Sequence, residues 1–213
     1  MGEVVQQPAA AAPYPEPRWP ALVSGLIVIL IGAFPAGGME AWIPITMIAV
    51  LAAWTLLSHR WHVQLGYANS VVSTLVLAYG LFDLVRNLVE SRKTTALQLL
   101  GGALILWTMN ILVFATWYWR LDAGGPHRRS HHRTYRDGAF LFPQLTLPHE
   151  RSQPDWRPQF VDYLFLSFNT STAFSPTDVP VLSRWAKVLM MLQSSISLTT
   201  LAIIAARAVN TLA

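Results

Sequence analysis

The sequence predicts an all-α, polytopic integral membrane protein with about five transmembrane helices and one short re-entrant half-helix. Of the 213 residues, 53% are hydrophobic and only 12% are charged, whereas soluble domains carry about 25% charged residues. The mean hydropathy is +0.39, and apolar runs of nearly membrane-spanning length recur along the chain. We therefore expect a multi-pass protein of a cell membrane. Short loops and the absence of cysteine are compatible with a bacterial inner membrane.

The first part of the chain divides into a tail and three helices. Residues 1–19 combine proline, alanine and polar residues without periodicity, which is typical of a disordered tail. A bilayer core of about 30 Å requires roughly 20 apolar residues per helix. The apolar runs of residues 20–94 accordingly predict helices at 20–36, 41–58 and 68–90. The first two are short and are separated by proline and glycine, which favours a helical hairpin.

The second part, residues 95–213, has two long apolar runs with a short one between them. We expect a helix at 95–119, a basic loop at 120–157, a short helix and loop at 160–180, and a last helix at 185–211. The short helix cannot span the bilayer, and a Ser-Pro pair follows it. It therefore predicts a re-entrant half-helix whose following turn faces a cavity or a partner.

The basic loop contains three histidines that suggest a metal site at first sight. Metal ligation requires neutral imidazoles, and the neighbouring arginines disfavour a bound cation. No spacing motif supports a metal site, and no cofactor is expected. The residues concerned are His127, Arg128, Arg129, His131, His132 and Arg133.

Composition and motifs also bear on the class of function. The net charge is +4, but most basic residues flank apolar helices, which predicts contact with membrane lipid and not with nucleic acid. The chain has no carboxylate pair, no nucleophile with a base and no phosphate-binding loop. We therefore do not expect an enzyme.

The segment DYLFLSFNTSTAFSPTD, from Asp162 to Asp178, carries a family resemblance. Without a gap, it is similar to the pore helix and filter of the potassium-channel superfamily, which commonly read DALYFSFVTLTTVGYGD. The order of outer helix, pore helix, filter loop and inner helix across residues 95–213 also resembles the pore module of that family. The identical positions are Asp162, Leu164, Ser167, Phe168, Thr170, Thr172 and Asp178.

The likeness ends at the filter, where residues 173–177 occupy the positions of TVGYG and both glycines are missing. Those glycines allow the backbone angles that point carbonyl groups at a dehydrated potassium ion, so a potassium-selective filter is not expected. The resemblance instead implies a homotetramer with a weakly selective pathway for monovalent cations, lined by hydroxyls and a ring of carboxylates. The candidate pore residues are Thr170, Thr172, Ala173, Phe174, Ser175, Pro176, Thr177 and Asp178.

Two of the long helices also carry polar residues. Gln193, Ser197, Thr200 and Arg207 share one face of the last helix. That stripe either lines a pore or packs against neighbouring helices, and the pattern supports the two interpretations equally. Asn110, near the middle of an earlier helix, is typical of hydrogen bonding between helices.

Two criteria disagree about the orientation in the membrane. Seven arginines in the basic loop place it in the cytoplasm by the positive-inside rule. The resemblance places the loop outside, which we favour because a long loop contributes less to that rule. Two functions stay open: a channel-like cation pathway, and a non-conducting protein whose basic loop binds a partner or anionic lipid.

Overall fold

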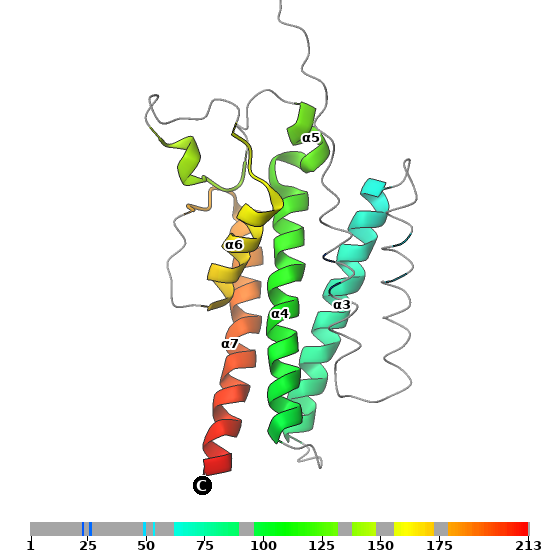
Figure 1. The fold of residues 1–213 in the computed structure, drawn as a ribbon, viewed down its shortest axis with the longest axis vertical. Helices are drawn as coiled ribbons and strands as arrows, with labels where there is room; N and C mark the ends of the chain where they lie inside the picture. Colours follow the sequence, from blue (N-terminus) through cyan, green and yellow to red (C-terminus); the bar gives the residue numbers. More distant parts are fainter. Residues whose placement is uncertain are drawn as a thin grey trace, which may run out of the picture.

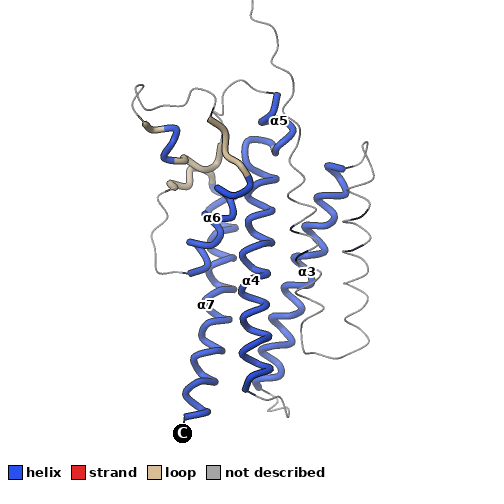
Figure 2. The backbone as a smooth tube through the Cα atoms, viewed as in Figure 1, coloured by secondary structure: helices blue, strands red, loops and turns tan. Residues whose placement is uncertain are grey.

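The computed structural model describes residues 23, 26, 49, 53, 62–89, 96–131, 138–147, 156–172 and 179–212. Within these ranges the backbone consists of helices and short loops (Figure 2). The described residues form no strand and one isolated β-bridge. The tail expected at 1–19 lies outside the described residues. The helices expected at 20–36 and 41–58 do so too, apart from four single positions.

Three long helices form the body of the described structure. They are α3 (His62–Val89), α4 (Ala96–Leu121) and α7 (Arg184–Leu212). In Figure 1, α4 lies between α3 and α7 and runs in the opposite direction to both. Each of the three is long and apolar enough to cross a membrane. For the described residues this confirms an all-helical fold that contains helices long and apolar enough to cross a membrane.

The observed helix bounds lie close to the expected ones. α3 begins six residues before the expected start at residue 68, since the polar first turn HVQLGY continues the helix beyond the apolar run. α4 extends two residues past the expected end at 119 and α7 adds one residue at each end. Differences of one or two residues are the usual variation of helix termini, whereas the start of α3 lies six residues earlier than expected.

A short helix, α6 (Phe160–Thr172), lies beside the upper halves of α4 and α7 (Figure 1). Its 13 residues correspond to about 20 Å at 1.5 Å per residue, less than the thickness of a bilayer core. The backbone N–H of Gln159 donates to Oδ2 of Asp162 at 2.6 Å. This is the acidic half of a capping box, and it fixes where α6 begins.

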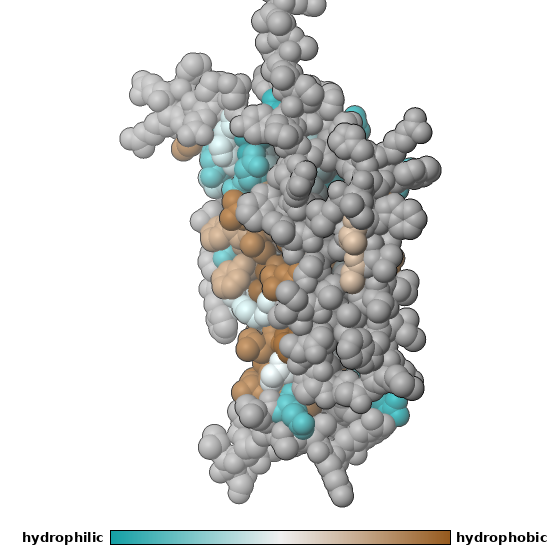
Figure 3. All heavy atoms as spheres, turned by 45° about the vertical axis from the view of Figure 1, so that its right-hand side comes forward, coloured by the Kyte–Doolittle hydropathy of each residue, from teal (hydrophilic) through white to brown (hydrophobic). Residues whose placement is uncertain are grey.

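The buried core is centred on α4, because that helix contacts the other long helices and α6. Leu77 and Leu84 of α3 pack on one side of α4, and Tyr163 and Leu166 of α6 pack on another. On the surface, Figure 3 shows apolar side chains of the described residues gathered at mid-height and polar ones mainly toward the two ends. Large apolar side chains remain exposed on the outer faces, including Leu75 and Leu198 at 64% and 65%. Such an apolar band suits contact with lipid.

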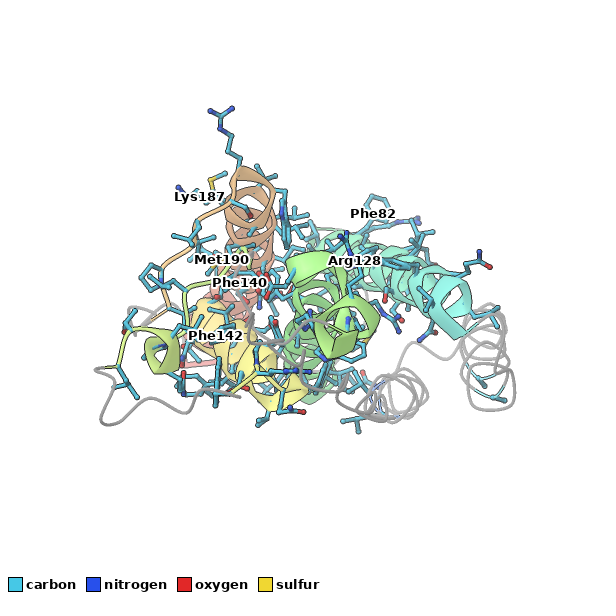
Figure 4. The ribbon with its side chains drawn as sticks, turned by 90° about the horizontal axis from the view of Figure 1, so that it is seen from above. Phe82, Arg128, Phe140, Phe142, Lys187 and Met190 are labelled. Atoms are coloured by element: carbon cyan, nitrogen blue, oxygen red, sulfur yellow. The ribbon has the colours of Figure 1, made fainter. Side chains whose placement is uncertain are left out.

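The segment expected to be a polar basic loop contributes to the core. Phe140 is buried and its ring packs edge-on against Tyr118, Tyr163 and Trp185, with centroids 5.3 to 6.1 Å apart. Figure 4 shows Phe140 among α4, α6 and α7, seen from above. The loop holds further helical turns, α5 (Pro126–His131), η2 (Asp122–Gly124) and η3 (Pro143–Leu145). The expected basic loop at 120–157 thus contains short helical turns among its described residues.

Backbone pairing between two distant segments holds Phe140 in place. The N–H of Leu141 donates to the carbonyl of Pro180 at 2.9 Å, and the N–H of Leu182 donates to the carbonyl of Ala139 at 2.8 Å. Phe140 and Val181 form the bridge between these bonds. The chain before α6 is thereby joined to the chain before α7.

A tight turn ends α4 and redirects the chain into α5. Gly125 has a φ of 91°, a backbone conformation in which residues with a side chain are strained. A Cβ atom at Gly125 would lie 2.8 Å from the carbonyl oxygen of Arg120. Glycine is therefore required at this position for two independent reasons.

Replacing Gly125 with alanine should lower the free energy of unfolding by about 1–3 kcal/mol, since both the φ angle and the backbone contact become unfavourable. Thermal unfolding in mild detergent measures the effect. Gly101→Ala is the matched control, because a Cβ atom there has no neighbour within 4 Å and alanine favours helix. Equal stability of the two variants would contradict this account of the turn.

Candidate functional site

A network of polar side chains, buried between α4, α6 and α7, is the most elaborate polar feature of the described residues. Gln193 of α7 lies at its centre and has no exposed surface. Its Nε2 group donates to Oγ of Ser171 at 2.6 Å and to both Oγ and the carbonyl oxygen of Ser167 at 2.7 Å. An amide nitrogen has two hydrogens, so these three acceptors share them. Gln193 therefore holds α6 against α7.

The same network connects α4 to α7 and to α6. The hydroxyl of Tyr118 donates to Oε1 of Gln193 at 2.5 Å, and Oγ of Ser167 donates to the carbonyl oxygen of Ile111 at 2.7 Å. Tyr118 and Ser167 are fully buried. Because polar groups buried in apolar surroundings require hydrogen bonds, this network ties all three helices to one another.

Asn110 extends the network by one helical turn along α7. Its Nδ2 donates to the carbonyl oxygen of Gln193 at 3.1 Å and to Oγ of Ser197 at 2.8 Å. The interhelical role expected for Asn110 is thereby confirmed. Its Oδ1 is buried and accepts no hydrogen bond from the described residues.

The structure places the polar stripe of α7 inside the chain. Gln193, Ser197 and Thr200 are between 0% and 1% exposed, and the hydroxyl of Thr200 donates back to the carbonyl of Ile196. Within a single chain these side chains are therefore packed between helices, as the second of the two interpretations predicts. The side chain of Arg207 lies outside the described residues.

Of the candidate pore residues, the structure describes two. Thr170 is 8% exposed, and its hydroxyl donates to the carbonyl of Leu166 at 2.8 Å. The hydroxyl of Thr172 donates to the carbonyl of Asn169 at 3.0 Å. Both side chains thus bond within α6, near its carboxyl end. The six remaining candidates, Ala173, Phe174, Ser175, Pro176, Thr177 and Asp178, lie outside the described residues.

The amino end of α6 is held by an acidic residue at the end of α4. Asp122 is fully buried; its Oδ1 accepts the backbone N–H of Ala139 and its Oδ2 accepts the hydroxyl of Tyr163, each at 2.5 Å. Within α6 itself, burial raises the pKa of the Asp162 carboxyl, and the hydrogen bond from Gln159 acts in the opposite direction. Asp122 therefore fixes α6 and the Phe140 segment to α4.

Sequence reasoning missed the partners of Gln193. Ser167 and Ser171 are four residues apart and share one face of α6, which was the available signal. Tyr118 had no comparable signal in the sequence. In the described part of the chain, no group of three His, Cys, Asp or Glu side chains could hold a metal ion, and the side chains of His127, His131 and His132 are not among those described.

These features define the class: an all-helical chain with spans long enough for a membrane and a polar network between them. Comparison with protein-family models, with curated proteins and with solved structures found no match.

Replacing Gln193 with leucine should lower the free energy of unfolding by roughly 2 kcal/mol, because Tyr118, Ser167 and Ser171 each lose a buried partner. Unfolding in mild detergent, followed by tryptophan fluorescence, measures the loss. Ser195→Ala is the control on the same helix, since its exposed hydroxyl only donates to the carbonyl of Met191. A stability of Q193L within 0.5 kcal/mol of the control, about the usual surface effect, would show that the network is not needed.

Proposed function

We propose that this chain is a channel-like integral membrane protein of a bacterial inner membrane, with about five spanning helices and α6 as a re-entrant half-helix. Four copies would surround a weakly selective pathway for monovalent cations. The observation that carries this proposal is the position of α6, which is too short to span and is fixed between α4 and α7 by Gln193. That order and packing support the resemblance to an outer helix, a pore helix and an inner helix.

The pathway in this proposal is formed by the chain that follows Thr172. The carboxyl end of a helix carries a partial negative charge, which attracts cations, and α6 ends at Thr172. Hydroxyls of Ser175 and Thr177 and a ring of Asp178 carboxylates would provide oxygen ligands for a cation that keeps part of its hydration shell. Without filter glycines, discrimination between potassium and sodium should be weak.

The burial of the α7 stripe restricts how such a pathway is built. Gln193, Ser197 and Thr200 are committed to contacts within one chain. The proposed lining therefore consists of the loop at residues 172–178, with the polar stripe of α7 acting as its support.

Asp178→Asn should reduce the flux of sodium and potassium several-fold or change their ratio, because the neutral amide removes the charge that concentrates cations. Purified protein in liposomes with an encapsulated cation-sensitive dye provides the measurement. Thr199→Ala, an exposed change whose hydroxyl only donates to the carbonyl of Ser195, should conduct like the native chain. Identical flux through native and D178N protein would contradict the proposed pathway.

A second candidate is a non-conducting membrane protein that uses this fold as a scaffold and its basic loop as a contact surface for a partner or for lipid. It is favoured by the hydrogen bonds that Gln193, Thr170 and Thr172 already make within the chain. The native mass in mild detergent distinguishes the two. A stable monomer without flux supports the scaffold, whereas a tetramer with flux supports the channel.

A further inference from the structure

Two arginines are buried around one tryptophan just where α4 ends. Arg120 and Arg129 are each 7% exposed, and the guanidinium carbon of each lies 5.8 Å from the centroid of the Trp119 ring. Arg129 also lies 5.2 Å from the ring of Tyr163. Guanidinium groups interact favourably with aromatic faces, so these contacts help to position the Arg129 side chain.

Only part of the hydrogen-bonding capacity of Arg129 is used by the described residues. Its Nη1 donates to the backbone carbonyl of Asp122 at 2.6 Å, while its Nη2 is buried and makes no hydrogen bond there. Both carboxylate oxygens of Asp122 accept other donors, from Ala139 and Tyr163. A buried cationic donor without a partner is costly. The arrangement therefore favours an anion as the missing acceptor.

A second guanidinium lies at the same turn and is exposed. A Cβ atom at Gly124 would lie 2.6 Å from Cδ and 3.1 Å from Nε of Arg128, so this side chain runs across the turn that also binds Arg129 through Asp122. Figure 4, seen from above, shows Arg128 well separated laterally from Lys187 on α7. A buried guanidinium and an exposed one thus lie at the same turn.

The position of the turn identifies the source of the anion. The span that contains α4 ends at Gly124, and Trp117 and Trp119 precede it, as aromatic side chains do at membrane boundaries. Headgroup phosphates lie at that level, and arginine binds phosphate through two parallel hydrogen bonds. An anionic phospholipid offers this phosphate without the choline cation that two arginines would repel.

We propose that Arg129 and Arg128 bind the phosphate of an anionic phospholipid at the turn between α4 and α5. Arg129 supplies the free Nη2 donor in a fixed orientation, and Arg128 closes over the phosphate from the exposed side. Lipid binding at this turn is independent of ion passage, since the loop at 172–178 follows the opposite end of α6.

The test titrates phosphatidylglycerol or phosphatidylcholine into the full-length protein in mild detergent and follows the thermal unfolding midpoint, which rises when a ligand binds the folded state. Phosphatidylglycerol should bind the native chain about tenfold more tightly than phosphatidylcholine. Arg128→Gln should weaken phosphatidylglycerol binding about tenfold, the effect of one charge-assisted hydrogen bond. Arg129→Lys should also weaken phosphatidylglycerol binding about tenfold, because lysine keeps the charge but lacks the two parallel N–H donors of the guanidinium.

Lys187→Gln is the matched control, an exposed basic residue in the first turn of α7, and it should change binding less than twofold. If Arg129→Lys does not fold, Arg128→Gln decides alone. Equal losses for R128Q and K187Q, or equal binding of the two lipids, would overturn the proposal. Inorganic phosphate that raises the midpoint as strongly as the lipid, in an Arg129-dependent manner, would assign the site to a free anion and overturn the lipid.

Discussion

An amide surrounded by apolar side chains must find partners or lose several kcal/mol, and Gln193 finds them on two other helices. Its Nε2 donates into α6 and its Oε1 accepts from α4. These bonds are directional, whereas the aliphatic contacts around them would tolerate sliding of one helix along another. The register of α6 between α4 and α7 therefore depends on these polar bonds, and every proposal about the loop after α6 depends on that register.

Asp122 provides the matching constraint at the other end of α6. Through Tyr163 and Ala139 it connects α4, α6 and the segment around Phe140. α6 is thus fixed at its beginning by the Asp122 carboxylate and in its second half by the Gln193 amide. Between them, Ser167 bonds to the backbone of α4 at Ile111. A short helix fixed at three levels is a rigid support for the chain that leaves it.

The sequence predicted the helices well and their contacts poorly. Apolar runs and the Ser-Pro stop located α4, α6 and α7, because the length of an apolar segment is a local property. An isolated Asn110 in an apolar helix was also sufficient to predict a bond between helices. The stripe at Gln193 was ambiguous, since periodicity defines a face and not what covers it. The burial of Phe140 depends on pairing with Val181, forty-one residues away, and Arg129 is buried through stacking on rings from two helices; neither contact has a local signal.

The order of Gln193 and α6 along the chain affects how the protein is made. Synthesis runs from the amino end, so α6 leaves the ribosome before the residue that holds it. Before α7 is made, Ser167 and Ser171 of this 13-residue helix lack the hydrogen-bond partner that Gln193 provides. The docking of α6 against Gln193 therefore has to follow the synthesis of α7, which makes α6 one of the last elements to reach its final place.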